Sequence, residues 1–218
     1  MTGEQAMIEN SRETRMALAG GRGLLRRTGA MGAMAALLAL TGCISLGGKV
    51  PDQLLTLSPA VTASAGSATS GNFNNAIAVL DPGTPRELDA QRIPVQIDDT
   101  QIAYLQNATW VEKPARLFRD LLSETIRAKG DRLVIGGADE QYAAATKLTG
   151  QLLMMGYDAR SQSVVIRYEA VLARPGGDIR TRRFESVVPG IGPTADQVGP
   201  ALNRAANDVA AQVAQWIG

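Results

Sequence analysis

The stretch "SVVIRYEAVLA", residues 163–173, alternates apolar and polar side chains in a regular way. Arg167 and Glu169 fall on one side of this pattern. A repeat of two residues is typical of a β-strand with one face on a core and the other in water. The stretch therefore predicts a half-buried strand whose inward side chains are Val164, Ile166, Tyr168, Ala170 and Leu172.

Turns flank this strand on both sides. "ARSQ", residues 159–162, joins it to "TKLTGQLLMMGYD", residues 146–158, and "ARPGGD", residues 173–178, leads to "IRTRRFESVV", residues 179–188. Short polar links between alternating runs indicate hairpins, so these segments predict an antiparallel meander. The side chains predicted to share a face are Leu148, Leu152 and Met154 in the first neighbour, and Phe184, Ser186 and Val188 in the second.

Shorter apolar runs upstream predict further strands. They are "LLTL" (54–57), "NAIAVLDP" (75–82), "RIPVQIDD" (92–99), "QIAYLQN" (101–107) and "DRLVIGG" (131–137). Pro94 lacks a backbone donor, which favours an edge strand or a bulge at that position.

A helix is predicted between the fourth and fifth of these strands. Pro114 suits a first helical turn, and Gly130 can adopt the left-handed conformation that ends a helix. Trp110 is predicted to pack where the chain enters the helix. The apolar stripe has three- and four-residue spacing and consists of Leu117, Phe118, Leu121, Leu122 and Ile126.

A second helix is predicted between Thr194 and Ile217, with Gly199-Pro200 either kinking it or delaying its start to Pro200. Its apolar stripe is Val198, Leu202, Ala205, Val209, Val213 and Trp216. Such a stripe has to pack on another element, and the sheet is the simplest partner. The predicted fold class is therefore α+β: a largely antiparallel sheet with two helices packed on one face.

The only cysteine, Cys43, lies in "ALTGCISLGG", residues 39–48. A basic segment with Arg22, Arg26 and Arg27 comes first, followed by the uncharged run 30–40 and the small residues Thr41 and Gly42. This order is the layout of a secretory signal peptide, and the run is too short for a transmembrane helix of about 20 residues. Residues 1–42 are therefore predicted to be a signal peptide, with Met16 as an alternative start.

"LTGC", residues 40–43, resembles the bacterial lipobox. The resemblance implies that the Cys43 thiol receives a diacylglyceryl group, that signal peptidase II cuts between Gly42 and Cys43, and that the new amino group is acylated. Two acyl chains already give stable membrane attachment. Ile44 stands where an aspartate retains enterobacterial lipoproteins at the inner membrane, so the outer membrane is expected. Arg26-Arg27 leaves twin-arginine export open as an alternative route.

The mature chain is predicted to have three parts. A lipidated tether, residues 43–53, reaches about 35 Å at most when extended. A domain follows at residues 54–218, and its Ser/Ala/Thr/Gly-rich segment 58–72 is expected to be a flexible loop.

Composition argues against most catalytic classes. The chain has no histidine, which excludes histidine triads, and a single cysteine, which excludes zinc sites built on Cys and His. The acidic pairs Asp98-Asp99 and Asp139-Glu140 are interpreted as solvated turn residues. The 22 basic and 21 acidic residues nearly balance, so no nucleic-acid partner is expected. Neither an enzyme activity, a metal nor a cofactor is predicted.

The order of these segments resembles the ABC-type transport auxiliary lipoprotein family, the PqiC-like lipoproteins. The resemblance rests on the lipobox followed by "LLTL", on Trp110 and Pro114 before an amphipathic helix, on "VIRYEAVL" and "RRFES", and on the closing helix "ALNRAANDVAAQVAQWI". It implies a periplasmic accessory protein, anchored in the outer membrane through its acyl chains. Its implied partners are an MCE-domain protein and an ABC transporter that move lipids between membranes, and family members can assemble as homo-oligomeric rings.

Two other classes remain open at this point. One is a structural lipoprotein that assists the assembly of an outer-membrane machine. The other is an enzyme that uses carboxylates alone, such as a glycosidase.

We predict that Cys43 is acylated and that residues 1–42 are absent from the mature protein. Mass spectrometry of membrane-extracted protein should show an acylated N-terminal cysteine, and Cys43→Ser should remove both the lipid and the membrane attachment. An intact chain starting at Met1 or Met16, or a Cys43→Ser variant located like the wild type, would contradict this.

Overall fold

The computed structural model describes residues 53–66, 68–130, 132–135 and 144–218. They belong to one compact unit, Val50–Gly218. Gly42 and Cys43, the predicted signal peptide and most of the tether lie outside the described residues, as do Asp139 and Glu140. No helix in the described part of the chain is long and apolar enough to cross a membrane.

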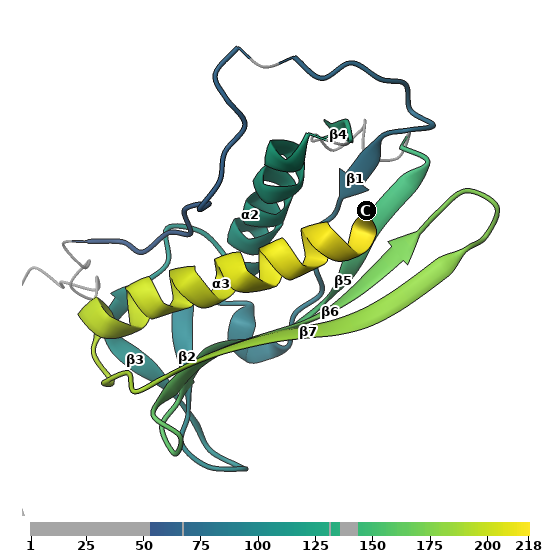
Figure 1. Ribbon diagram of the computed structural model, residues 1–218. Coiled ribbons are helices and arrows are strands. Elements are labelled where there is room, and N and C mark those ends of the chain that lie inside the picture. The colour runs from purple at the N-terminus through teal and green to yellow at the C-terminus, as the bar shows by residue number, and fades with distance from the viewer. Residues whose placement is uncertain (1–52, 67, 131, 136–143) are drawn as a thin grey trace, which may run out of the picture. The chain divides into compact units, whose positions relative to one another are not determined.

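The domain combines one sheet with two long helices (Figure 1). The strands are β1 (Ile77–Val79), β2 (Arg92–Gln96), β3 (Ile102–Thr109), β4 (Val134–Ile135), β5 (Thr146–Asp158), β6 (Ser163–Ala173) and β7 (Ile179–Pro189). The helices are the short 3₁₀ helix η2 (Arg86–Leu88), α2 (Pro114–Lys129) and α3 (Ala195–Ile217).

The seven-stranded sheet is mixed. Antiparallel ladders join β2 to β3, β5 to β6 and β6 to β7, whereas β1 runs parallel to β4 and β5, and β2 runs parallel to β5. The α+β class is confirmed, and the predicted meander of β5, β6 and β7 is present. The parallel ladders correct the expectation of a largely antiparallel sheet. They join segments far apart in the chain, and a local pattern of alternation does not record such pairings.

Helix α2 begins and ends at the predicted residues. Pro114 occupies the first turn, and Gly130 adopts a left-handed conformation with φ 79° after the last turn. All five residues of the predicted stripe are buried, and the Phe118 ring meets the Tyr168 ring of β6 edge-on at 5.1 Å between centroids. Trp110 is 1% exposed, as expected for a residue that packs where the chain enters the helix.

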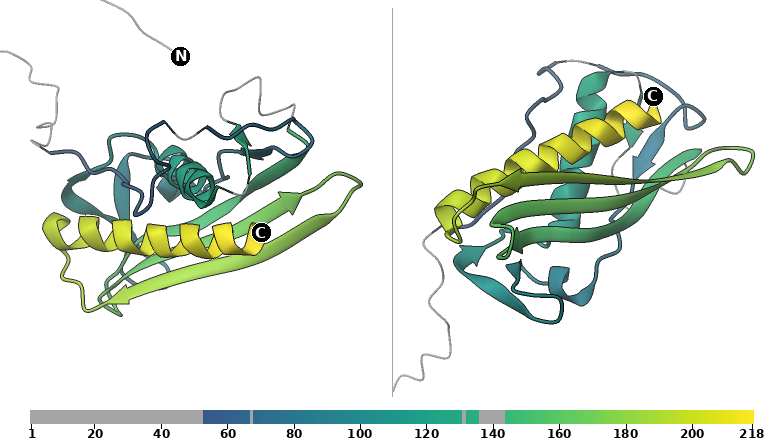
Figure 2. Two further views of the ribbon diagram at one scale, coloured as in Figure 1. Left: turned by 45° about the horizontal axis from the view of Figure 1, so that its top comes forward. Right: turned by 60° about the horizontal axis from the view of Figure 1, so that its bottom comes forward.

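Helix α3 begins at Ala195, with Thr194 at its N-cap, and includes Pro200. Because proline lacks an N–H, one bond of the second turn is missing, but the helix is not delayed to Pro200. Figure 2 (left) shows α2 and α3 on the same side of the sheet, as predicted. The residues of α3 that this packing buries are Val198, Gly199, Ala201, Leu202, Ala205, Ala206, Val209, Ala210, Val213, Ala214 and Ile217.

The strands differ from the predictions in two places. In β5 the register shifts between Leu152 and Met154, so Met155 is fully buried in place of the predicted Met154. A bulge inserts one residue and thereby reverses the faces of all later side chains. The predicted strand 54–57 is reduced to one parallel bridge between Leu55 and Trp110.

We predict that Gly150 cannot carry a side chain. Its φ is 151°, and a Cβ there would lie 1.9 Å from the Glu169 carbonyl oxygen of β6. Gly150→Ala should therefore cost about 3 kcal/mol or more of unfolding free energy, because backbone atoms have to move apart. Gly176→Ala is the matched control, since Gly176 also has a positive φ but no atom within 4 Å of the added Cβ. It should cost about 1–2 kcal/mol in urea unfolding. Equal losses for the two variants would contradict the prediction.

Candidate functional site

No group of three or more His, Cys, Asp or Glu side chains that could hold a metal occurs among the described residues. Carboxylates do gather in one open groove of about 280 Å³ at the turns after β2 and β5. Its lining residues are Gln96, Asp99, Met154, Asp158, Arg160, Val165 and Arg167, with no aromatic ring among them.

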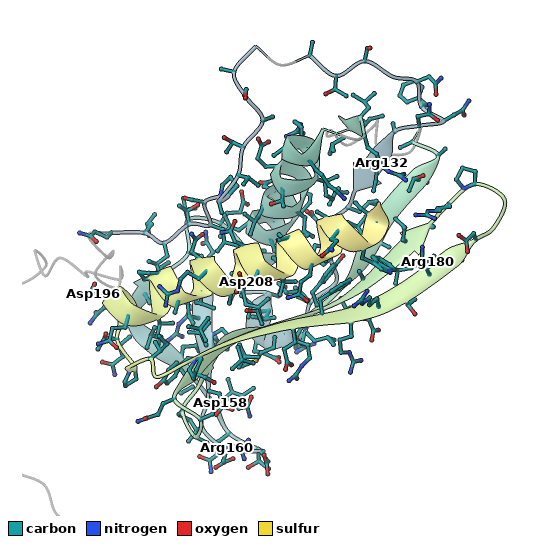
Figure 3. The ribbon with its side chains drawn as sticks, viewed as in Figure 1. Arg132, Asp158, Arg160, Arg180, Asp196 and Asp208 are labelled. Carbon is teal, nitrogen blue, oxygen red and sulfur yellow. The ribbon has the colours of Figure 1, made fainter. Side chains whose placement is uncertain are left out.

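Both carboxylates of this groove face Arg160. The distance from Arg160 Nη1 to Asp99 Oδ1 is 2.8 Å, and the distance from Arg160 Nε to Asp158 Oδ1 is 3.9 Å. Figure 3 shows Asp158 and Arg160 together at this end of the sheet. Asp98, in contrast, accepts bonds from the backbone N–H groups of Thr100 and Gln101, and Asp98-Asp99 forms the solvated turn that was predicted.

The groove does not provide a general acid. Partial burial opposes ionisation of Asp158, but hydrogen bonds from the N–H groups of Arg160 and Ser161, together with the Arg160 charge, outweigh it and lower the pKa. A glycosidase acid needs a raised pKa so that it holds its proton near neutral pH. The paired carboxylates and the lining without aromatic side chains therefore do not support the glycosidase alternative.

The sheet offers an interaction surface at β7 instead. An edge or a bulge was expected at Pro94. Strand β2 lies between β3 and β5 and is not an edge, but its register shifts between Arg92 and Pro94, which confirms the bulge. Strand β7 pairs only with β6 in the described chain, so its eleven residues, Ile179–Pro189, form a long edge of the sheet. Figure 1 shows this edge below α3.

The hydrogen-bonding groups on this edge can be assigned from the register. Arg174 N–H donates to Asp178 O at 2.8 Å, and every second pair along an antiparallel ladder repeats such a bond. Arg180, Arg182 and Phe184 therefore bond to β6, whereas Thr181 and Arg183 direct their N–H and C=O groups away from it. These outward groups are available to a further strand.

Opposite charges hold the solvent-facing side of this hairpin. Arg167 pairs with Glu185 directly across the ladder, and Arg183 Nη2 lies 2.6 Å from Glu169 Oε2. Ile179 and Val187 near the two ends of β7 are 65% and 48% exposed. The edge thus combines unused backbone groups with apolar side chains at both ends.

A second feature connects the N-terminal side of the domain to its helices. We call residues Gln53–Ala63 the strap. Ser58 and Ala60 donate their N–H groups to the Oδ1 atoms of Asn203 and Asn207 on α3 at 2.8 and 2.7 Å. Ala63 N–H donates to Glu124 Oε1 on α2 at 2.8 Å. The described residues of the segment 58–72 form no helix or strand, as predicted, but the first part of the segment is bonded to both helices; its flexibility stays a prediction.

Leu55 fixes the start of the strap. Its N–H donates to Thr109 O at 2.8 Å, and its carbonyl accepts from Val111 N–H at 2.8 Å. A Cβ on Gly199 of α3 would lie 2.9 Å from Leu55 Cδ2, so the leucine packs where only glycine leaves room. The sequence pattern does not indicate this contact, because Leu55 and Gly199 are 144 positions apart in the chain.

The domain combines an α+β fold with a strapped N-terminal segment and a free sheet edge at β7. The family model of the ABC-type transport auxiliary lipoprotein component matches residues 55–214, and the chain belongs to this family. The resemblance stated from the sequence is thereby confirmed. The protein is an auxiliary lipoprotein component of ABC-type transport.

Solved structures support the fold. A protein from Xanthomonas campestris assigned to DUF330 is 16% identical, with a TM-score of 0.63 over 76% of this chain and 94% of its own. A second crystal structure, of an uncharacterized protein, is also 16% identical, with a TM-score of 0.58 over 76% of this chain and all of its own. A comparison with curated proteins found no match.

We predict that Glu124 fastens the strap in a pH-dependent way. The hydrogen bond from Ala63 N–H lowers the pKa of Glu124 below its usual 4.5; partial burial opposes this, and Arg127 reinforces it. A depressed pKa stabilises the fold above pH 4.5, and this stabilisation is lost as the pH falls through the lowered value. Glu124→Gln should cost on the order of 1 kcal/mol at pH 7 and much less at pH 3.

Urea unfolding at the two pH values measures this difference, and amide exchange at Ala63 shows whether the strap is affected. Glu112→Gln is the control, since Arg116 is the one ion-pair partner of Glu112 among the described residues, and the pair is exposed. A loss that does not depend on pH, or unchanged exchange at Ala63, would show that Glu124 does not fasten the strap.

Proposed function

We propose that this lipoprotein is an accessory component of an MCE-type ABC transport system that moves lipids between membranes. In this proposal Cys43 carries the acyl chains and holds the protein at the periplasmic face of the outer membrane. The observation that carries the proposal is the family match over residues 55–214, which makes the protein an auxiliary component of ABC-type transport. The MCE partner, the lipid cargo and the outer membrane are the proposed refinements.

The task of the domain is recognition of a protein partner. Both carboxylates of the groove face Arg160, and the lowered pKa of Asp158 does not suit a general acid, so the groove does not favour a catalytic role. The edge of β7, in contrast, presents backbone groups of Thr181 and Arg183 to solvent. A strand of the MCE protein added to this edge would bond to those groups, and Ile179 and Val187 would cover its side chains.

The same edge also suits a neighbouring copy of the chain. A head-to-tail contact closes into a ring when its rotation closes, so self-assembly through β7 is the competing use of this surface. The structural alternative, assistance in assembling an outer-membrane machine, would use the edge for a different partner.

We predict that Thr181→Pro abolishes partner binding while the fold persists. Proline removes the outward N–H of residue 181 and leaves the bonds between β7 and β6 in place, which edge strands tolerate. Thr181→Val keeps the N–H and is the matched control. Arg182→Pro removes a bond to β6 instead and should destabilise the domain by about 3 kcal/mol.

The measurement is affinity purification of the tagged lipoprotein from native envelopes after crosslinking. Wild type and Thr181→Val should recover the MCE protein, and Thr181→Pro should not, although its thermal unfolding is cooperative. Recovery of only an outer-membrane assembly complex would favour the structural alternative. Recovery of only the lipoprotein itself in crosslinked multimers would indicate that the β7 edge joins copies of this chain in a ring.

A further inference from the structure

Four arginines surround the C-terminal end of α3. Arg132 Nε donates to Gly218 O, and Arg174 Nη2 donates to Ile217 O, each at 3.1 Å. Arg180 and Arg182 lie on β7 beside them, and Figure 3 shows Arg132 and Arg180 near this end of the helix. We call these four residues the basic end.

Two of these side chains are held by aromatic rings. The Arg180 guanidinium lies 5.5 Å from the centroid of Trp216, and the Arg182 guanidinium lies 5.1 Å from that of Phe184. The two rings meet edge-on at 5.6 Å, so the two guanidinium groups are held by one aromatic pair. Stacking orders an arginine without using its N–H donors.

The charge at this end is not matched by acidic side chains of the described residues. Arginines elsewhere on the surface, such as Arg119, Arg167 and Arg183, pair with Asp or Glu, but no described Asp or Glu side chain forms an ion pair with the basic end. The negative end of α3 explains part of the clustering, because Arg132 and Arg174 cap its last carbonyls. A helix end carries only about half a unit charge, which cannot balance four guanidinium groups.

The donors point to the chemistry of the ligand. Arg180 and Arg182 are two residues apart on one strand, so their backbones are roughly 7 Å apart and their side chains can reach a common anion. The planar fork of arginine matches the oxygen pairs of phosphate.

An aromatic side chain beside the arginines favours a lipid as the source of the phosphate. Trp216, whose ring contacts the Arg180 guanidinium, is partly exposed. Tryptophan and arginine together are typical of surfaces that lie at the level of lipid headgroups. For a lipoprotein, the acyl anchor keeps such a surface at high effective concentration near the bilayer.

We propose that the basic end binds the phosphate headgroups of anionic phospholipids and gives the domain a second contact with a membrane surface. This contact rests on the lipoprotein family and does not require the MCE partner. Each arginine near an anionic surface contributes attraction that salt screens.

The test uses full-length lipoprotein reconstituted into vesicles that contain phosphatidylcholine with a spin-labelled headgroup. Trp216 reports contact, since Trp110 is buried and shielded from the quencher. Adding phosphatidylglycerol to about a third of the lipid should increase quenching at low salt. The double variant Arg180→Gln/Arg182→Gln should lower the docked-to-undocked ratio by on the order of tenfold. High salt should do the same to the wild type.

Arg167→Gln/Arg183→Gln is the control, because it removes the same charge from the solvent-facing side of the same hairpin. It should leave the quenching nearly unchanged. Equal quenching in vesicles with and without phosphatidylglycerol, or equal losses in the two double variants, would overturn the proposal. A response of Trp216 to inorganic phosphate but not to phosphatidylglycerol would also overturn it and would assign the site to a free anion.

Discussion

The close packing of α3 against the sheet and α2 is the contact on which the other features depend. Its buried face is rich in alanine, including Ala201, Ala205, Ala206 and Ala210. Small side chains let the helix axis approach the strands and α2, and a helix of 23 residues then spans about 35 Å. Along that length α3 supplies Asn203 and Asn207 to the strap, covers one face of β6 and β7, and brings its C-terminal carbonyls to Arg132 and Arg174.

The sequence predicted those parts of the fold that short-range physics determines. Pro114 and Gly130 mark the ends of α2 through backbone geometry alone, and the alternation from Val164 to Leu172 identifies β6 and its buried face. The parallel ladders of β1 were missed because pairing between distant segments leaves no periodicity. The bulge after Leu152 was missed because neither glycine nor proline occurs between Leu152 and Met154 to indicate an extra residue. The bulge moves Met154 off the core face.

The candidate site was less accessible to sequence reasoning. The absence of histidine pointed away from acid–base catalysis, and the structure adds that the two carboxylates that do converge both face Arg160. Cys43 lies outside the described residues, and its acylation stays a prediction. Pro94 correctly indicated an edge or a bulge, since β2 has the bulge, but which strand forms an edge depends on sheet order, so the edge at β7 was not predicted. The basic end could not be predicted either, because Arg132, Arg174 and Arg180 come from separate segments that only the fold brings together.

The strap also has a mechanical consequence. Its bonds at Leu55, Ser58, Ala60 and Ala63 lie in series along the chain, so a pull from an anchor at Cys43 would load them one after another from one end. Peeling of this kind needs only the strength of one bond at a time, whereas α3 and the sheet share their load over many contacts. The strap would therefore yield first, and its roughly eleven residues would add up to about 35 Å to a tether of similar reach. Release of the strap would thus lengthen the connection between the anchor and the domain core. A partner bound to the domain would then reach nearly twice as far from the membrane before the core bears any tension.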